Sequence, residues 1–199
     1  MNFDQLLVAD RGQPAQTIEV IAPDAAEAWL AFQPPRTRAA LTAQRFTGKA
    51  GSIATVVDDH GQWRAVMAVA DAASPWALAK LAETLPEGIY RLAGVPLEAP
   101  ALGWLLGQYR FDRYRKPDDA NPRVLLTADP ARIDETVRLA AATAQVRDLV
   151  NTGANDLGPA ELEETAAALA RRYGGQLRVT AGEAPVSYTH LTLPTILRV

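Results

Sequence analysis

The alternation of short β-type segments with helical segments is the feature that most constrains the fold of this 199-residue chain. Segments rich in Val, Ile, Thr or aromatic residues, which favour strands, occur at residues 17–22, 52–57, 63–69, 89–92 and 123–127. Helical patterns lie between them, at residues 24–32, 37–45, 75–85 and 99–113. This order predicts an α/β fold in which helices flank a sheet.

Two of the predicted strands are close enough in sequence to form a hairpin. Residues 58–62 read DDHGQ, a turn-forming string, and they join the segments at 52–57 and 63–69. Parallel strands need a much longer crossover connection, so this pair is expected to be antiparallel. We therefore predict a mixed sheet, with the hairpin as its antiparallel part.

Two further helices are predicted after the last strand. Asp129 and Pro130 should open the first, because Asp can accept hydrogen bonds from free backbone N–H groups and Pro suits the first helical position. Apolar and small residues then recur at helical spacing: Ile133, Val137, Ala140, Ala141 and Ala144. The second helix should begin at Gly158 and Pro159 and end at Gly174 and Gly175, with a strand at 176–180 after it.

Composition narrows the class of protein. Hydrophobic residues make up 48% of the chain and charged residues 22%, which is typical of a globular protein. The formal net charge of −3 gives no support for nucleic-acid binding, and the absence of Cys excludes disulfides and thiolate metal ligands. The first residues lack the basic and apolar pattern of a secretory signal, and no apolar stretch of about 18 residues indicates a membrane span. We expect a cytoplasmic protein.

One string of residues carries a family resemblance. Residues 147–162 read RDLVNTGANDLGPAEL, joining a helix end, a polar turn and a second helix start. The string resembles the junction between the N-terminal and catalytic domains of the leucyl aminopeptidase (cytosol aminopeptidase) family. The positions that match are Asn151, Thr152, Ala154, Asn155, Pro159 and Leu162, whereas Gly153 stands where the family has proline. Gly also suits a turn, so the departure is compatible with the resemblance.

A second string agrees with the first and precedes it, as it does in the family. Residues 103–115 read GWLLGQYRFDRYR. They resemble a helix of the family's N-terminal domain, whose pattern is Gly-x-Tyr-x-Phe-x-x-Tyr followed by a basic residue.

The resemblance implies a domain layout and a function. Residues 1–129 would form a macro-domain-like α/β domain, residues 130–150 a linker helix, and residues 151–185 the truncated start of an α/β catalytic domain. The parent protein would remove N-terminal residues from peptides with two divalent metals, Mn²⁺ or Zn²⁺, as a cytoplasmic homo-oligomer.

The last fourteen residues, 186–199, are expected to be foreign to the natural sequence. Residues 186–195 read VSYTHLTLPT, and a DNA string that encodes them resembles a transposase adapter used in sequencing libraries. We therefore expect the natural sequence to end near Pro185 and exclude the tail, with His190, from the fold. The alternative is a β-strand, because Val186, Tyr188 and Thr189 have high β propensity.

No catalytic, cofactor-binding or metal-binding residue is assigned to this chain. The metal signature of the family, Asn-Thr-Asp-Ala-Glu-Gly-Arg, is absent. Asn151 and Thr152 begin in the same way, but Gly153, Ala154 and Asn155 follow where Asp-Ala-Glu is needed. We expect the chain alone to be inactive as a peptidase.

The remaining polar candidates have ordinary structural explanations. His60 lies in the predicted hairpin turn, where a solvated role is expected rather than a ligand or base. Asp58 and Asp59 could chelate a hard cation, but two adjacent carboxylates without further oxygen donors are typical of a soluble turn. Gly103 and Gly107, four residues apart on an apolar helix, are expected to permit close packing, since a phosphate site would need a Gly-rich strand-to-helix loop.

One segment combines basic and aromatic residues, and it could stack on nucleic-acid bases. Its members are Tyr109, Arg110, Phe111, Arg113, Tyr114, Arg115 and Lys116. Its helical spacing favours aromatic side chains in the core with a basic rim around them.

Two other functions remain open. The first domain could be a stand-alone binding module, because macro-like domains recognise nucleotides such as ADP-ribose, although no Gly-rich phosphate loop is present. It could also be an oligomerisation or regulatory domain without a ligand. If the chain is truncated, residues 150–199 should be loosely held, because their apolar faces lack the sheet that would cover them.

Overall fold

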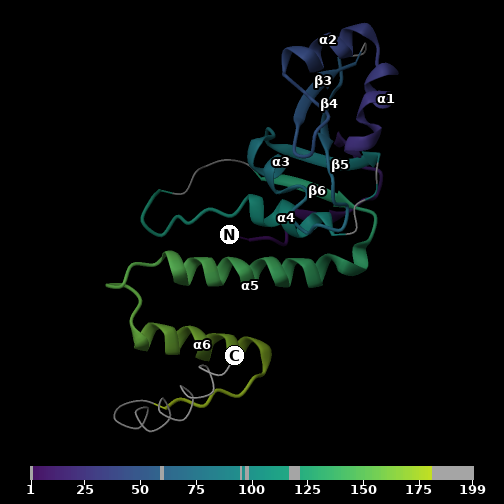
Figure 1. The fold of residues 1–199 in the computed structure, drawn as a ribbon. Coiled ribbons are helices and arrows are strands. Elements are labelled where there is room, and N and C mark those ends of the chain that lie inside the picture. Colours follow the sequence, from purple (N-terminus) through teal and green to yellow (C-terminus); the bar gives the residue numbers. More distant parts are fainter. Residues whose placement is uncertain (1, 59–60, 95, 97–98, 117–121, 181–199) are drawn as a thin grey trace, which may run out of the picture. The chain divides into compact units, whose positions relative to one another are not determined.

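The computed structural model describes residues 2–58, 61–94, 96, 99–116 and 122–180 (Figure 1). The chain divides into two compact units, Met1–Asp148 and Leu149–Val199. The adapter-like tail at 186–199 and the segment 117–121 lie outside the described residues.

Among the described residues of the first unit, six strands form one sheet with the order β1-β6-β5-β2-β4-β3. Their bounds are β1 Leu7–Ala9, β2 Gln16–Ile21, β3 Ile53–Val57, β4 Trp63–Ala68, β5 Gly88–Gly94 and β6 Arg123–Thr127. Neighbouring strands are parallel except β3 and β4, which pair antiparallel. The predicted α/β fold with a mixed sheet is therefore confirmed, and the hairpin supplies its antiparallel pair.

The five strands predicted between residues 17 and 127 are all present, with ends that differ by at most two residues. The strand that the sequence analysis missed is β1. It has three residues and pairs with β6 alone, Leu7 opposite Leu125 and Ala9 opposite Thr127. A strand this short carries too few residues for its alternation to be recognised.

Helices cover the sheet, and their bounds correct two predictions. In the first unit they are η1 Pro23–Ala25, α1 Ala26–Ala31, α2 Pro35–Ala43, α3 Ala79–Thr84, α4 Pro100–Gly107, η2 Pro130–Arg132 and α5 Ile133–Asn151, whose last three residues belong to the second unit. The prediction of a helix at 75–85 was wrong at its start, because residues 75–78 form turns before α3. The predicted helix at 99–113 ends at Gly107 instead.

Tertiary hydrogen bonds explain why α4 ends early. The backbone N–H of Arg123 donates to Oε1 of Gln108, and Nε2 of Gln108 donates to the Arg123 carbonyl, at 2.9 and 2.8 Å. The hydroxyl of Tyr109 donates to Asp148 on α5 at 2.6 Å. These contacts set the direction of the chain after Gly107, and they outweigh the helical propensity of the residues that follow.

The sheet has a hydrophobic core on each face. Along β4, Ala65 and Met67 belong to one cluster, whereas Val66 and Ala68 belong to the other, as expected for side chains that alternate across a strand. The first cluster also contains buried residues of α3, α4 and α5, and the second contains residues of α1 and α2. The first unit is thus a sandwich of helices, sheet and helices.

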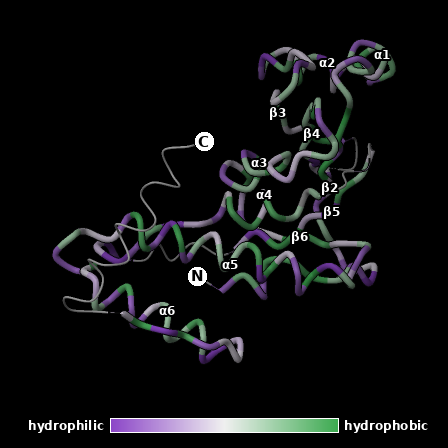
Figure 2. The backbone as a smooth tube through the Cα atoms, turned by 60° about the horizontal axis from the view of Figure 1, so that its bottom comes forward, coloured by the Kyte–Doolittle hydropathy of each residue, from purple (hydrophilic) through white to green (hydrophobic). Residues whose placement is uncertain are grey.

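The second unit contains the helix α6, Pro159–Tyr173. As predicted, it begins after Gly158, whose N–H donates to the Glu161 carboxylate at 2.8 Å, and it ends at Gly174, which has φ +65°. Hydrophilic and hydrophobic residues alternate along α6 (Figure 2), and none of its residues is buried.

The strand predicted at 176–180 is absent, which corrects the sequence analysis. A β-strand needs hydrogen bonds from a neighbour, and none of the described strands pairs with these residues. Leu177 and Val179 are 44% and 46% exposed, so their β propensity alone does not form a strand.

Candidate functional site

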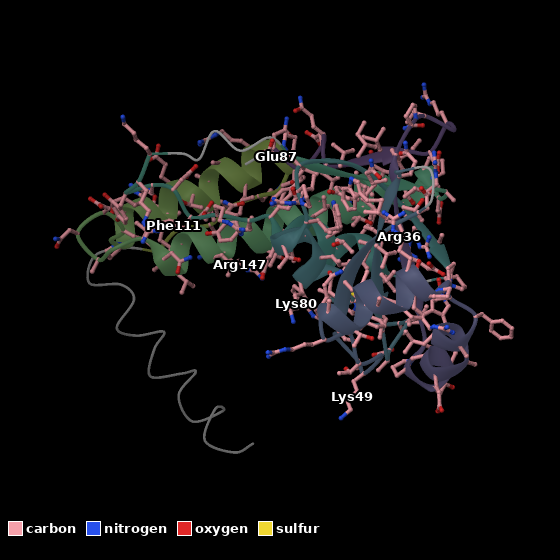
Figure 3. The ribbon with its side chains drawn as sticks, turned by 90° about the horizontal axis from the view of Figure 1, so that it is seen from above. Arg36, Lys49, Lys80, Glu87, Phe111 and Arg147 are labelled. Atoms are coloured by element: carbon pink, nitrogen blue, oxygen red, sulfur yellow. The ribbon has the colours of Figure 1, made fainter. Side chains whose placement is uncertain are left out.

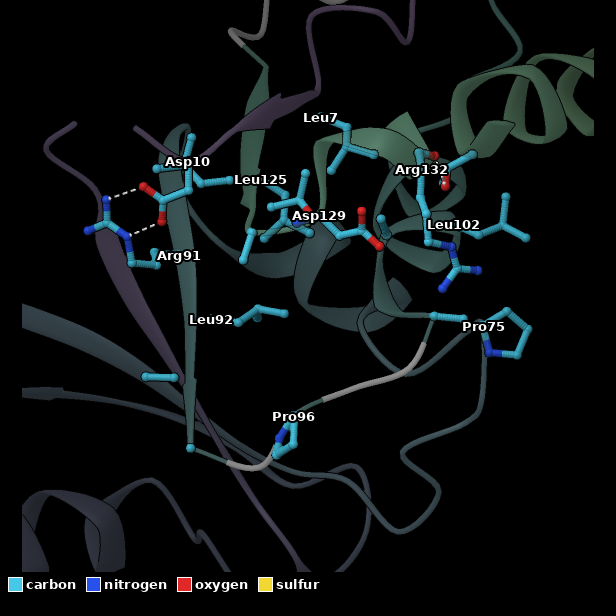
Figure 4. Close-up of a pocket in the computed structure, with 18 of the residues that line it drawn as sticks. Leu7, Asp10, Pro75, Arg91, Leu92, Pro96, Leu102, Leu125, Asp129 and Arg132 are labelled. Carbon is cyan, nitrogen blue, oxygen red and sulfur yellow. Dashed lines mark hydrogen bonds and ion pairs between the residues drawn. The ribbon is translucent and has the colours of Figure 1, made fainter. Parts of the chain in front are cut away.

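A cavity of about 640 Å³ lies at the carboxyl ends of β1, β6 and β5, within the first unit (Figure 4). The first turns of α4 and α5 complete its wall. Most of the wall is apolar and contains six leucines, Leu7, Leu92, Leu102, Leu125, Leu126 and Leu139. Crevices outside the carboxyl ends of parallel strands are common binding sites in open α/β sheets. The volume also falls in the range of small-molecule pockets.

Four charged residues line this cavity, Asp10, Arg91, Asp129 and Arg132. They come from different elements: Asp10 follows β1, Arg91 belongs to β5, and Asp129 and Arg132 come from the connection between β6 and α5. Two are acids and two are bases, so the cavity carries no strong net charge.

Asp10 and Arg91 form an ion pair at one side of the cavity. Nε of Arg91 donates to one carboxylate oxygen of Asp10 at 2.5 Å, and the guanidinium donates to the other at 2.9 Å. The Gly12 N–H also donates to this carboxylate, at 2.8 Å. The Arg91 hydrogen bond is the main cause that lowers the pKa of Asp10 to about 2.

Asp129 does not cap the helix that follows it, which contradicts the sequence prediction. Its side chain makes no capping hydrogen bond, and the helix opens with the short turn η2. The backbone of Asp129 has φ −113° and ψ 83°, outside the extended geometry typical of an N-cap, and its N–H donates to Thr127 Oγ1 at 3.1 Å. Its exposed carboxylate is directed into the cavity instead (Figure 4).

Asp58, the one hairpin candidate among the described residues, does not line this cavity. Asp59 and His60 lie outside the described residues. The carboxylate of Asp58 accepts the backbone N–H of Gln62 at 2.9 Å, and the Asp58 N–H donates to the Gln62 carbonyl at 2.8 Å. Asp58 therefore acts as a turn residue that closes the hairpin.

Gly103 and Gly107 permit close packing of α4, as predicted. A Cβ on Gly103 would lie 2.5 Å from the Pro75 carbonyl oxygen, and one on Gly107 would lie 2.4 Å from the Ala79 carbonyl oxygen. The Gly103 N–H also donates to the Pro75 carbonyl at 2.6 Å. Neither glycine lines the cavity.

The basic and aromatic segment does not form the helical face that the sequence predicted. Phe111 packs edge-on against Tyr114, with 5.7 Å between ring centroids, and Tyr114 is 55% exposed. The Arg147 guanidinium lies 5.4 Å from the centroid of the Tyr109 ring. Figure 3 shows the positions of Arg147 and Phe111. Only Tyr109 of these three aromatic residues packs against the main core.

The described residues do not fit a two-metal centre. No group of three or more His, Cys, Asp or Glu side chains in that part of the chain is arranged to hold a metal ion. Asn151 and Thr152, which begin like the metal signature, lie at the end of α5 and just after it. No chemical step through a metal is therefore derived from these residues.

Sequence reasoning did not recognise the charged residues of the cavity as neighbours. Asp10 and Arg91 are 81 positions apart, and only the parallel order of β1, β6 and β5 brings them together. The available signal was the apolar run LLVA at 6–9 followed by the turn residues Asp10 and Gly12.

The comparison with protein families gives the decisive match. A family model described as the M17 aminopeptidase N-terminal domain matches residues 16–127. That is more than half of the chain. The chain belongs to the M17 aminopeptidase N-terminal domain family. The M17 match includes β2 to β6 and ends just before Ala128 and Asp129, so part of the cavity wall lies beyond it.

Individual proteins that are similar to this M17 chain are also aminopeptidases by name. A probable cytosol aminopeptidase of Brucella suis is 37% identical over 87 residues, which cover 38% of this chain and 18% of that protein. The crystal structure of the Coxiella burnetii cytosol aminopeptidase superposes with a TM-score of 0.76 at 25% identity, covering 91% of this chain and 41% of that one. The apo leucyl aminopeptidase of Trypanosoma cruzi shares the fold at 18% identity, with a TM-score of 0.59 and coverage of 93% and 41%.

The M17 chain thus spans less than half the length of these relatives. Within the part of it that the structure describes, no helix combines the length and apolar character needed to cross a bilayer.

Proposed function

We propose that this chain is the N-terminal part of a leucyl aminopeptidase, and that the peptidase centre belongs to the remainder of the longer protein. The observation that carries the proposal is the M17 match over residues 16–127, together with coverage of only 41% of the Coxiella burnetii enzyme. In this proposal the longer protein removes N-terminal residues from peptides, and the present chain supplies none of the catalytic groups.

The proposed layout follows the sequence analysis. Residues 1–129 would form the N-terminal domain, 130–150 the linker helix, 151–185 the start of the catalytic domain, and 186–199 an adapter-derived tail. The apolar residues of α6 support this layout, because Leu162, Leu169 and Tyr173 are 53%, 38% and 57% exposed. Apolar side chains in such a row are normally covered, and the catalytic domain would cover them.

The metals and the assembly belong to the same proposal. The longer protein would use two divalent metals, Mn²⁺ or Zn²⁺, and would act in the cytoplasm as a homo-oligomer. The Brucella and Coxiella relatives are both named cytosol aminopeptidases, which supports the cytoplasmic compartment. Light scattering on the full chain tests whether the present residues are sufficient for assembly, and a strict monomer would place the oligomer contacts in the remainder.

An activity assay tests the central proposal. The purified 199-residue chain is incubated with leucine p-nitroanilide and Mn²⁺ or Zn²⁺, beside the Coxiella burnetii enzyme as positive control. We expect release of p-nitroaniline by the control alone. Metal-dependent release by this chain, abolished by a chelator, would contradict the assignment of all catalytic groups to the remainder.

The cavity at the strand ends favours a second function, ligand binding by the N-terminal domain. A nucleotide such as ADP-ribose would need donors for its phosphates. The connection from β6 to α5 instead reads Ala128-Asp129-Pro130, with an acid and a proline where backbone N–H groups would be required. An acid and a proline at this position disfavour a phosphate ligand.

A further inference from the structure

The cavity at the carboxyl ends of β1, β6 and β5 combines apolar walls with two acids whose contacts differ. Asp10 is neutralised by Arg91 through two hydrogen bonds. Asp129 differs, because its carboxylate has neither a capping hydrogen bond nor any ion pair within the described residues. A carboxylate of this kind, facing a cavity, is available to a ligand.

The charge of the wall selects the kind of ligand. An anion with several charges would meet the Asp129 carboxylate and find the Arg91 guanidinium already occupied by Asp10. A primary ammonium group suits Asp129, since hydrogen bonds between two charged groups are stronger than neutral ones. The Arg132 guanidinium also lines the cavity and has five N–H donors, so a carboxylate on the same ligand is tolerated there.

The apolar part of the wall selects the body of the ligand. Leu92 of β5, Leu102 of α4 and Leu125 of β6 line the space beside Asp129 (Figure 4). Aliphatic side chains bound there would leave water for an apolar surface, which is favourable in proportion to the area buried. A volume of about 640 Å³ accommodates more than one amino-acid side chain.

We propose that this cavity is a non-catalytic binding site for short apolar peptides with a free amino terminus, held by an ion pair between their ammonium group and Asp129. The inference does not depend on the peptidase activity proposed above. It rests on the charge and shape of the cavity, and it is tested by binding alone.

A series of dipeptides tests separately the need for an ammonium group and the need for apolar side chains. The ¹⁵N-labelled full chain is titrated with Leu-Leu up to 10 mM, and chemical shifts are followed at Gly94, Thr127 and Ala128. We expect saturable changes at these amides. Leu-Leu amide, which keeps the ammonium group, should bind within about threefold, whereas N-acetyl-Leu-Leu and Glu-Glu should bind at least about tenfold more weakly.

A pair of variants tests whether Asp129 binds the ammonium group of the peptide. Asp129→Asn should weaken Leu-Leu binding about tenfold, because it removes the charge that faces the ammonium group. Asp134→Asn, an exposed acid on α5 that does not line the cavity, is the matched control and should leave binding unchanged. Unaltered shift dispersion in both spectra would show that each variant is folded.

Several results would overturn the proposal. These are an absence of shift changes with Leu-Leu at 10 mM, equal binding of N-acetyl-Leu-Leu, and equal binding by Asp129→Asn. Saturable binding of ADP-ribose or inorganic pyrophosphate without any binding of Leu-Leu would also overturn it, and would assign the cavity to phosphate ligands. None of these outcomes depends on whether the chain hydrolyses leucine p-nitroanilide.

Discussion

The guanidinium of Arg91 holds the carboxylate of Asp10 with two hydrogen bonds, at 2.5 and 2.9 Å, across the intervening strand β6. The same guanidinium donates to the Gln13 carbonyl at 2.8 Å. One side chain of β5 therefore holds two points, Asp10 and Gln13, of the loop between β1 and β2. Because β1 has three residues, this ion pair is a main attachment of the loop to the sheet.

The ion pair predicts an acid dependence of stability. Arg91 lowers the pKa of Asp10 from 3.8 to about 2 in the folded protein. A lowered folded-state pKa stabilises the protein above the unfolded value, and that contribution is lost as pH falls toward about 2. We expect Asp10→Asn to reduce the pH dependence of the urea midpoint between pH 4 and pH 2, roughly the interval between the two pKa values.

The control for this prediction is Asp112→Asn, which removes an exposed acid that takes part in no ion pair of the described residues. Its urea midpoint should follow that of the unchanged protein across the same pH interval. If the urea midpoints of the unchanged protein and of Asp10→Asn fall by the same amount between pH 4 and pH 2, the ion pair does not contribute to folding.

Two glutamines offer a matched test of burial. The side-chain amide of Gln108 forms hydrogen bonds with the backbone N–H and C=O of Arg123, and Gln108 is 6% exposed. The side-chain amide of Gln44 forms the same two hydrogen bonds with the backbone of Thr55, but Gln44 is exposed. We expect Gln108→Met to lower the free energy of unfolding by about 1–3 kcal/mol, because the part-buried N–H of Arg123 loses the side-chain oxygen that accepts from it. Gln44→Met should cost less than about 1 kcal/mol, since water can replace the lost hydrogen bonds.

Urea unfolding of both variants measures this difference. Trp104 also donates to the Arg123 carbonyl, at 2.9 Å, and it remains in place in Gln108→Met. The Arg123 N–H is therefore the group that loses its acceptor, Oε1 of Gln108. Equal losses in Gln108→Met and Gln44→Met would show that burial is not the deciding factor.

The packing of α4 against α3 predicts a penalty for any side chain at Gly107. The ideal Cβ would lie 2.4 Å from the Ala79 carbonyl oxygen, a backbone atom that cannot move aside as a side chain can. Gly107→Ala should therefore lower the free energy of unfolding by about 1–3 kcal/mol despite the higher helix propensity of Ala. Gly175→Ala is the control, because its Cβ would meet its nearest atom at 3.6 Å. A neutral or stabilising Gly107→Ala would contradict the observed approach of the two helices.

The sequence predicted the central part of the sheet because the signal there is local. Strands such as β3 and β4 carry enough alternating or β-branched residues to be recognised, and the turn at 58–62 fixes their antiparallel pairing. β1 could not be recognised from three residues, and the end of α4 is decided by the hydrogen bonds of Gln108 to Arg123, fifteen positions further along the chain. Boundaries set by distant partners are not contained in a local pattern.

The candidate site was inaccessible to sequence reasoning for the same reason. Its charged residues are separated by up to 122 positions, from Asp10 to Arg132, and the strand order alone brings them together. Asp129 was assigned to helix capping because Asp before Pro usually caps. The backbone directs the Asp129 side chain toward the cavity instead. Asp129, predicted only as a helix cap, is therefore the main candidate for binding a ligand.

The last prediction concerns the stability of α6. None of its residues is buried, whereas β2 and β4 contain Ile18, Ala65 and Val66 at 0% exposure. Amide hydrogen exchange reports local opening, and segments with few buried contacts open at low free energy. We expect peptides from Pro159–Tyr173 to exchange much faster than peptides from Gln16–Ile21 and Trp63–Ala68, as measured by mass spectrometry of the full chain. Peptides from the long helix α5 provide the comparison between helices, because Ala140 and Ala144 are buried there. If α6 were protected as strongly as β2 and β4, the first and second units would open together, and the proposal that α6 needs a further domain to cover it would fail.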